Sequence, residues 1–330
     1  MNKLLALSIL ATGVLLTGCG GGGGGGSSAG GTTSTSSPDT SNLSGLAEDV
    51  QAFNYLNKER LRCGFGSLTR MTALDNAAKA HANWMIHTEQ FGHTEDPTLY
   101  PAGFTGVSVS DRIDYQNAYP NGYKAFETIA SLHGLGKTGE GVNSMSRLLN
   151  APYHSIGLLD GYRDVGAAVI NGSEVGLSST ATFSAYLVGN DLTIGKQQVP
   201  IDAVATYPCD GSEGVANQLT NETPNPVTGR NLATNPLGVT FTLKVTDGQR
   251  LTITSASVVE TSTGQAVSLR PAVGGYNNTP DPVGEFSESM AYISADVPMN
   301  TFTKYTATIT GTNNGTPFSK VFSFTTGSSY

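Results

Sequence analysis

The side chains with the most chemical potential in this sequence of 330 residues are its three cysteines and five histidines. A cysteine thiol can be lipidated, oxidised to a disulfide or used as a metal ligand. An imidazole can bind a metal or transfer a proton near neutral pH. No phosphate-binding glycine loop follows a predicted strand, and no Gly-x-Ser-x-Gly element is followed by triad partners in a workable order. The chemistry must therefore come from thiols, imidazoles and the carboxylates beside them.

Cys19 ends an N-terminal segment that is typical of export signals. Lys3 supplies a positive charge, and residues 4–16 form an apolar run that is too short for an ordinary membrane-spanning helix. The sequence Leu-Thr-Gly-Cys that ends at Cys19 resembles a bacterial lipobox. The resemblance implies a signal peptide at residues 1–18, cleavage after Gly18, and a thioether-linked lipid with further acylation on the new N-terminus. The alternative is an ordinary signal peptide that happens to contain a cysteine.

Lipidation would fix the location of the protein. Several acyl chains, such as palmitate, give durable anchoring where one chain alone is marginal. Gly20 follows the cysteine. In lipoproteins of bacteria with two membranes, an Asp at this position favours retention in the inner membrane, so Gly20 favours the outer membrane. We expect an exported lipoprotein of the bacterial cell envelope, in the outer membrane, whose orientation the sequence leaves open.

The charge balance excludes one class of partner. The chain has 26 acidic and 18 basic residues, a formal net charge of −8, and only 13% charged residues. Nucleic-acid binding needs concentrated Lys and Arg, and no basic cluster is present. The 41 glycines and low charge suit an exported protein that is rich in β-structure.

The other two cysteines, Cys63 and Cys209, are far apart in the sequence. Outside the cytoplasm such a pair favours a disulfide, which would close a long loop and tie the end of the first domain to its beginning. The alternative is a pair of free or metal-binding thiols, which two isolated cysteines signal only weakly.

The first part of the chain predicts a tether followed by an α+β domain. Residues 19–45 are rich in Gly, Ser and Thr and should stay flexible, because they can bury almost no apolar surface. Order should begin at residue 46. Apolar residues at helical spacing, together with favourable composition, predict helices at residues 46–61, 71–88, 125–132 and 142–149. Residues 164–170 and 181–188 predict strands, so we assign an α+β domain to residues 46–205.

The second part predicts an all-β domain. Residues 206–235 are rich in Pro, Asn, Thr and Gly and are interpreted as a linker. Beyond them, apolar and polar residues alternate in several short segments, with turn signals at Asp247-Gly248 and at residues 313–315. The strands are expected at residues 239–245, 251–253, 305–309 and 322–324. Short alternating strands favour a β-sandwich over residues 236–330.

Two family resemblances refine this organisation. Residues 300–311 and 322–326 resemble bacterial Ig-like domains. Residues 46–189 resemble the CAP superfamily, also called the SCP domain, through an ordered series of motif residues. The series is Asn57, Arg60, Gly64, Leu68, Leu74, Ala78, His81, Ala82, Met85, Phe91-Gly92-His93, Asp111-Arg112, Gly122-Tyr123, Phe126-Glu127-Thr128-Ile129, Ala151-Pro152-Tyr153-His154 and Val165-Gly166-Ala167-Ala168.

The CAP resemblance implies an α-β-α sandwich with a cleft lined by two histidines and two glutamates. His93 matches the first histidine, Glu127 the glutamate of a Gly-Glu-Asn motif, and His154 the second histidine. The second glutamate has no match, since its place falls near Ala151. Thr128 stands where the glutamate motif has Asn.

Two chemistries remain open for His93, Glu127 and His154. Two imidazoles and a carboxylate can hold a divalent metal, Zn or Mg, with an open position that activates water for a hydrolase. A metal-free group bound by hydrogen bonds is equally buildable. Because one carboxylate is missing, we favour a non-enzymatic cleft for a small apolar ligand, lipid or peptide. The alternatives are a metal-dependent hydrolase or peptidase, and an adhesive or structural protein that binds a protein partner through its Ig-like domain.

The remaining motif residues have structural interpretations. His81 should pack in the core, and His87 and His133 should lie at the surface. Arg112 should tie loops together through charge-assisted hydrogen bonds. Trp84 and Tyr123 could line a lipid groove, but core packing is the commoner role of such aromatics.

The lipidation hypothesis gives the first prediction. Replacing Cys19 by Ser removes the thiol that carries the lipid, so the variant should lose palmitate labelling and either leave the membrane fraction or keep its signal peptide. Metabolic labelling, fractionation and mass spectrometry measure these outcomes against the wild-type chain. Palmitate labelling that persists in the variant contradicts the assignment of Cys19.

Overall fold

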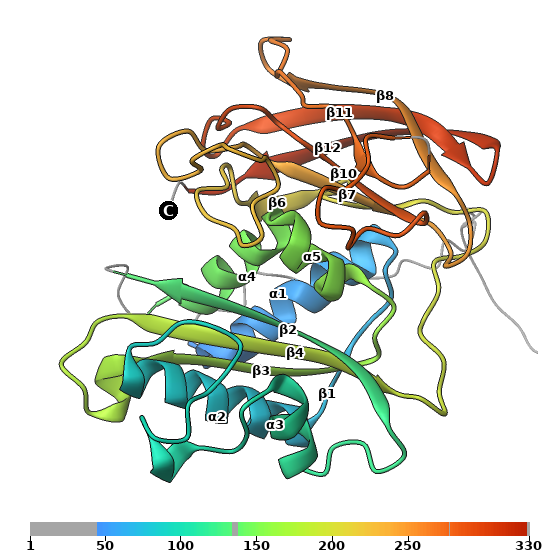
Figure 1. The fold of residues 1–330 in the computed structure, drawn as a ribbon. Coiled ribbons are helices and arrows are strands. Elements are labelled where there is room, and N and C mark those ends of the chain that lie inside the picture. Colours follow the sequence, from blue (N-terminus) through green and yellow to red (C-terminus); the bar gives the residue numbers. More distant parts are fainter. Residues whose placement is uncertain (1–44, 134–137, 277, 329–330) are drawn as a thin grey trace, which may run out of the picture. The chain divides into compact units, whose positions relative to one another are not determined.

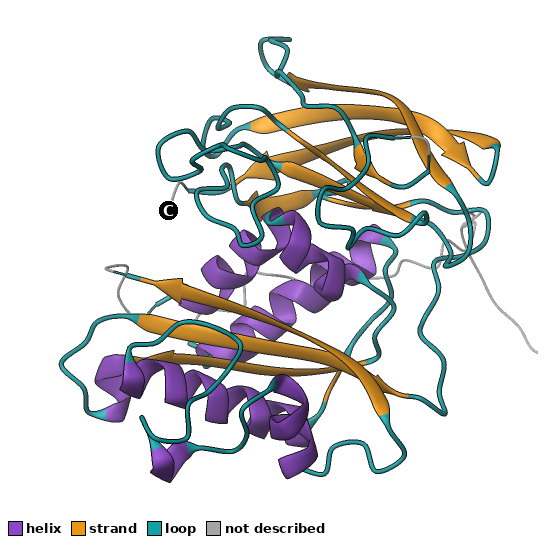
Figure 2. Cartoon of the chain, in the orientation of Figure 1, coloured by secondary structure: helices purple, strands orange, loops and turns teal. Residues whose placement is uncertain are grey.

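The computed structural model describes residues 45–133, 138–276 and 278–328 of the chain. The predicted signal peptide, Cys19 and residues 19–44 of the predicted tether lie outside the described residues. Helices and three β-sheets are present, which confirms the α+β class. Figure 2 shows that the helices gather around one of the sheets, whereas the other two are joined by loops. No helix in the described ranges is long and apolar enough to cross a membrane.

The helical part is built on a four-stranded sheet of order β1-β3-β4-β2, in which β1 runs parallel to β3 and the other pairs are antiparallel. Its elements in chain order are α1 (Glu48–Cys63), β1 (Thr69–Arg70), α2 (Thr72–Thr88), η2 (Pro101–Gly103), α3 (Val109–Tyr115), β2 (Tyr123–Leu132), α4 (Glu140–Asn150), α5 (Pro152–Leu159), β3 (Asp164–Asn171), η3 (Gly172–Val175) and β4 (Thr182–Asp191). Most of the predicted helices and strands are therefore confirmed.

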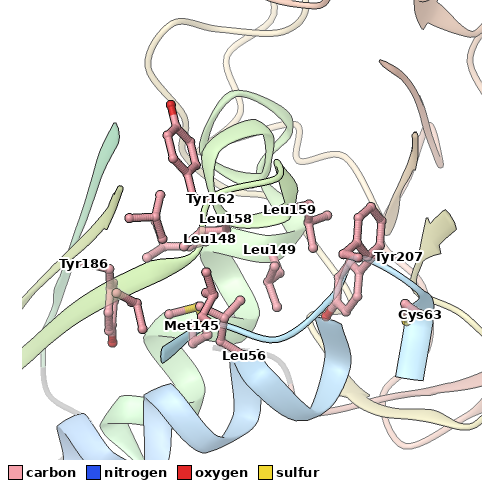
Figure 3. Close-up of a cluster of buried hydrophobic side chains, with 14 of the residues drawn as sticks. Leu56, Cys63, Met145, Leu148, Leu149, Leu158, Leu159, Tyr162, Tyr186 and Tyr207 are labelled. Carbon is pink, nitrogen blue, oxygen red and sulfur yellow. The ribbon is translucent and has the colours of Figure 1, made fainter. Parts of the chain in front are cut away.

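Helices lie on both faces of this sheet. In Figure 1, α2 and α3 lie on one face, and α1, α4 and α5 lie on the other. Figure 3 shows the second layer, where Leu56 of α1 and Met145 of α4 meet Tyr186 of β4. On the first face, Leu74 of α2 packs with Leu187 of β4. Two apolar layers, one per face, fix the sheet between the helices.

Gly166 permits the close approach of α2 to β3. A Cβ atom at this position would collide with the backbone of Leu74. The residue thus serves packing, in agreement with its place in the motif series.

One predicted element was wrong. Residues 125–132 were expected to be helical, but they belong to β2, which pairs with β4 from Tyr123↔Asp191 to Leu132↔Thr182. Phe126, Ile129 and Leu132 imitate a helical stripe. The strand alternation is hidden because helices cover both faces of the sheet, so Thr128 and Ile129 are both buried. Ten residues of ladder pairing outweigh a weak local preference.

The second part contains two four-stranded sheets of order β5-β7-β10-β9 and β6-β12-β11-β8. Its strands are β5 (Ala205–Tyr207), β6 (Ser212–Val215), β7 (Thr240–Lys244), β8 (Leu251–Glu260), β9 (Val273–Gly274), β10 (Met290–Ser294), β11 (Lys304–Asn313) and β12 (Thr316–Thr326). One apolar cluster joins both sheets and includes Phe241 of β7 and Phe324 of β12, whose rings meet edge to face. The turn at residues 313–315 closes the β11–β12 hairpin as predicted. The turn at Asp247-Gly248 instead joins strands of different sheets.

The segment interpreted as a linker takes part in these sheets. Within residues 206–235, Thr206 and Tyr207 belong to β5, and Ser212 to Val215 form β6, which runs parallel to β12. The strands are too short to show alternation, so the sequence did not reveal them. The domain limits at residues 205 and 236 remain predictions.

The predicted disulfide between Cys63 and Cys209 is confirmed. It joins the last residue of α1 to the turn between β5 and β6 across 146 positions of sequence. Ser212 reinforces the junction, since its hydroxyl donates to the buried Glu59 of α1 and accepts from the backbone N–H of Cys209. The helical part and the two sheets are therefore tied covalently and by hydrogen bonds.

The long loop leads to the second prediction. Replacing both cysteines by Ala should lower the free energy of unfolding by about 3 to 5 kcal/mol, because the open chain gains conformational entropy when it unfolds. Urea unfolding followed by circular dichroism measures the change. Wild-type protein treated with a reductant is the matched control and should unfold with the same midpoint. An unchanged midpoint in the double variant would show that the bond does not stabilise the fold.

Candidate functional site

His93 and Glu127 form the first contact of the site. His93 lies in the loop after α2 with its side chain half exposed, and its Nδ1 lies 2.8 Å from Oε2 of Glu127 on β2. Burial disfavours the charged form of Glu127. The hydrogen bond from His93 and the positive charges of His81 and Arg112 outweigh burial, so the pKa of Glu127 lies below its ordinary value. An ionised Glu127 therefore accepts the Nδ1 proton of His93.

Arg112 donates hydrogen bonds to both members of this pair. Its guanidinium is completely buried, and Nη2 donates to both oxygens of Glu127, at 2.9 and 3.0 Å, and to the carbonyl of His93 at 3.1 Å. A capping box between Ser108 and Asp111 begins α3 and so places the arginine. One side chain thus ties α3 to β2 and to the loop of His93, which is the loop-tying role predicted for Arg112.

His81 completes the buried network. It lies on α2 and is fully buried, with Nε2 at 2.8 Å from the carbonyl of Gly92 and Nδ1 at 2.9 Å from Oε1 of Glu95. A carbonyl can only accept, so Nε2 carries a proton, and the Nδ1–Glu95 contact needs one more. Both nitrogens are engaged within the protein, as the predicted core role requires.

His154 has a carboxylate partner from a distant segment. His154 lies in the first turn of α5, which begins at Pro152, and its Nδ1 is 3.4 Å from Oε1 of Glu222. The same oxygen accepts from the backbone N–H of Tyr153 at 2.6 Å. The Glu222 side chain is fully buried, and burial raises its pKa. Burial therefore disfavours the charged form of Glu222, whereas the partners of Glu127 favour its charged form.

The two imidazoles line one cavity. It has a volume of about 310 Å³, and its walls come from β2, α4 and the segment that follows β6. His93 and His154 both contribute, and most of the remaining wall is apolar. The apolar side chains are Phe91, Ile129, Ala130, Leu132, Leu148, Ala151, Ala216 and Leu219. Glu127 contacts His93 but does not line the cavity, whereas Glu222 and Arg147 do.

The three predicted metal ligands do not converge on one point. Glu127 contacts His93, whereas His154 contacts Glu222. Both oxygens of Glu127 already accept from Arg112, so a cation bound to this carboxylate would face a buried guanidinium. In the described ranges no group of three or more His, Cys, Asp and Glu side chains could hold a metal ion. A site that uses Glu127 as a ligand does not fit this geometry.

The other motif residues take structural positions. His87 is half-buried and stacks on Tyr100 with ring centres 4.3 Å apart, so it is less exposed than expected. His133 is exposed. Trp84 is almost wholly buried and donates to the carbonyl of Asp96. Tyr123 donates to the carbonyl of Ser110 and the carboxylate of Asp114 on α3. Trp84 and Tyr123 do not line the cavity that His93 and His154 share.

Two carboxylates of the site escaped the sequence interpretation. Glu95 lies two residues beyond His93, and its only signal was that proximity. Glu222 lies in the segment interpreted as a linker, where a single acidic residue among Asn, Thr and Pro gives no local signal. The motif places the second glutamate near Ala151, whereas Glu222 comes from the segment that follows β6.

Comparisons with known proteins find similarity to a solved structure. No protein-family model matches the chain, and no curated protein matches it. A solved structure of an extracellular protein containing an SCP domain, from Bacillus anthracis str. Ames, is similar at 20% sequence identity and a TM-score of 0.31. The similarity covers 42% of this chain and 39% of that protein, well under two thirds of its length.

The buried ion pair leads to the third prediction. Arg112→Gln leaves Glu127 without its guanidinium partner, so the free energy of unfolding at pH 7 should fall by about 3 to 5 kcal/mol. Because the pKa of Glu127 is lowered in the folded state, its ionised form stabilises the fold above about pH 4.5, and that contribution is lost as the pH falls further. The difference between wild type and variant should therefore shrink in acid.

Urea unfolding at pH 7 and at successively lower pH values measures this difference. Arg163→Gln is the matched control, since Arg163 is exposed and its side chain donates, among the described residues, to the carbonyl of Gly195. The control should change the free energy of unfolding by less than about 0.5 kcal/mol. Equal effects of the two variants at pH 7 would show that the buried pair does not hold the site.

Proposed function

We propose that this chain is an exported, lipid-anchored binding protein of the CAP class, whose cleft holds a small apolar or amphipathic molecule without chemical conversion. One observation carries the proposal. Two imidazoles, each with Nδ1 beside a buried carboxylate, line a single cavity whose wall is otherwise mostly apolar.

The composition of the wall supports binding of an amphipathic ligand. Sites for small molecules are concave and largely apolar, with a few convergent polar groups that set orientation. Ile129, Leu132 and Leu148 offer apolar contact here. With Nδ1 facing Glu127 or Glu222, the Nε2 atoms of His93 and His154 are the nitrogens available to a ligand's polar group.

The state of Glu127 argues for binding over catalysis. A general base must reach the reacting proton directly or through one water. Glu127 is buried, and its oxygens accept from Arg112 and from His93. Its role is to fix the orientation of His93 and not to touch a substrate.

The rest of the chain fits an envelope location. Lipidation of Cys19 would attach the chain to the outer membrane, and the tether would space the cleft from the lipid surface. The helices on both faces of the first sheet support the CAP class, and the two C-terminal sheets that share one apolar cluster support an Ig-like domain. The disulfide suits an oxidising compartment.

The fourth prediction tests the cleft with a dansyl-labelled fatty acid as the probe. All samples are produced without residues 1–18 and with Cys19→Ser, so that they carry neither signal peptide nor lipid and no detergent competes for the cavity. His93→Ala removes a polar contact, and Ala130→Trp fills the space beside it. Each should weaken probe binding about tenfold, since one lost hydrogen bond or a blocked pocket costs at least about 1.4 kcal/mol. Fluorescence titration measures the affinity.

The matched control is His133→Ala, an exposed histidine outside the cavity, which should leave the affinity unchanged. Failure of the wild type to bind, or equal loss in the control, contradicts the proposed cleft. Zinc content is measured on the same proteins. Zinc that is bound by the wild type and lost in His93→Ala would replace the metal-free cleft with a metal site.

A further inference from the structure

A second cavity of about 350 Å³ lies against the outer side of the sheet that contains β9 and β10. It shares no lining residue with the cleft of His93 and His154. Its wall is mostly apolar and unusually rich in proline. The apolar side chains are Pro226, Val227, Leu237, Pro271, Val273, Pro280 and Pro282. Proline offers a rigid apolar surface and no backbone N–H, so this wall presents few donors of its own.

Two guanidiniums and one carboxylate form a charged cluster beside this cavity. Asp296 accepts from Arg230 at 2.7 Å and from Arg270 at 2.9 Å, so one carboxylate serves two guanidiniums. Arg230 uses its other donors on backbone and amide oxygens around Asn235 and Pro236. Arg270 lines the cavity, and its side chain remains about one third exposed.

The nearest acid in the wall sequence is Asp281. Asp281, between two wall prolines, accepts from the hydroxyl of Tyr153 at 2.6 Å and from the backbone N–H groups of Val283, Glu285 and Phe286. The Asp281 carboxylate is thus already satisfied within the protein, and its pKa is lowered by these bonds against the opposing effect of burial.

Tyr292 of β10 adds a buried donor to the same cavity. The residue is 3% exposed, and its hydroxyl makes no hydrogen bond of normal length and angle among the described residues, although the hydroxyl of Tyr153 lies close enough to influence its pKa. Burial raises the pKa of Tyr292 to about 12, so the hydroxyl keeps its proton at neutral pH. A buried donor without a partner is costly, and an acceptor brought by a ligand would remove that cost.

We propose that this cavity is a binding site for a small organic carboxylate with an apolar body. Arg270 binds the carboxylate by a charge-assisted hydrogen bond, Tyr292 donates to it, and the proline-rich wall contacts the apolar body. The site is independent of the cleft and does not rest on the function proposed for it.

The fifth prediction uses naphthoate as a fluorescent probe, with the neutral naphthamide as its uncharged counterpart. Wild-type protein should bind naphthoate about tenfold more tightly than naphthamide, because only the carboxylate pairs with Arg270. Arg270→Gln should weaken naphthoate binding about tenfold and leave naphthamide binding unchanged. Thr279→Trp, at an exposed position in the wall, should block both probes.

Arg250→Gln is the matched control. It removes the same charge from an exposed arginine that pairs with Glu288 outside the cavity, and it should preserve naphthoate affinity. His93→Ala should also preserve it, which separates this site from the cleft. Equal affinity for the two probes, equal loss in Arg250→Gln, or full binding by Thr279→Trp would overturn the proposal.

Discussion

The buried guanidinium of Arg112 is the constraint on which the site depends. A charge that is removed from water must be paired and hydrogen-bonded, or it destabilises the fold by several kcal/mol. Arg112 meets this demand with Glu127 on β2 and with the carbonyl of His93, while Glu95 lies 3.7 Å from its Nε. The elements α3 and β2 and the loop after α2 must therefore be in place together.

The network also limits the charge of the site. Glu127 is ionised and faces Arg112, while the contact between His81 and Glu95 holds a proton between its partners. Two carboxylates are thus balanced by one guanidinium and one shared proton. Such an arrangement tolerates little change, since removal of any one member leaves a buried charge unpaired. It gives His93 a fixed orientation although its side chain is half exposed.

How well the sequence predicts the residues of this site depends on how far apart those residues lie along the chain. The motif series located His93, Glu127 and His154, because each lies in a local pattern. The helix predicted over residues 125–132 was wrong because both faces of β2 are covered, which hides the strand period. Glu222 and β6 were missed because they lie in the segment that follows Cys209, far in sequence from the helices they contact. The disulfide and Ser212 hold the start of this segment against α1. Local sequence patterns do not reveal contacts between such distant residues.

The two histidines of the cavity have different surroundings, because the partner of His93 lies on β2 and the partner of His154 lies in this distant segment. His93 faces a carboxylate that stays ionised, whereas His154 faces Glu222, whose pKa is raised by burial. His93 is also open to solvent, while the side chain of His154 is only 17% exposed. The two histidines therefore differ in exposure and in the charge preference of their carboxylate partners, so a molecule in the cavity would meet two unlike imidazoles.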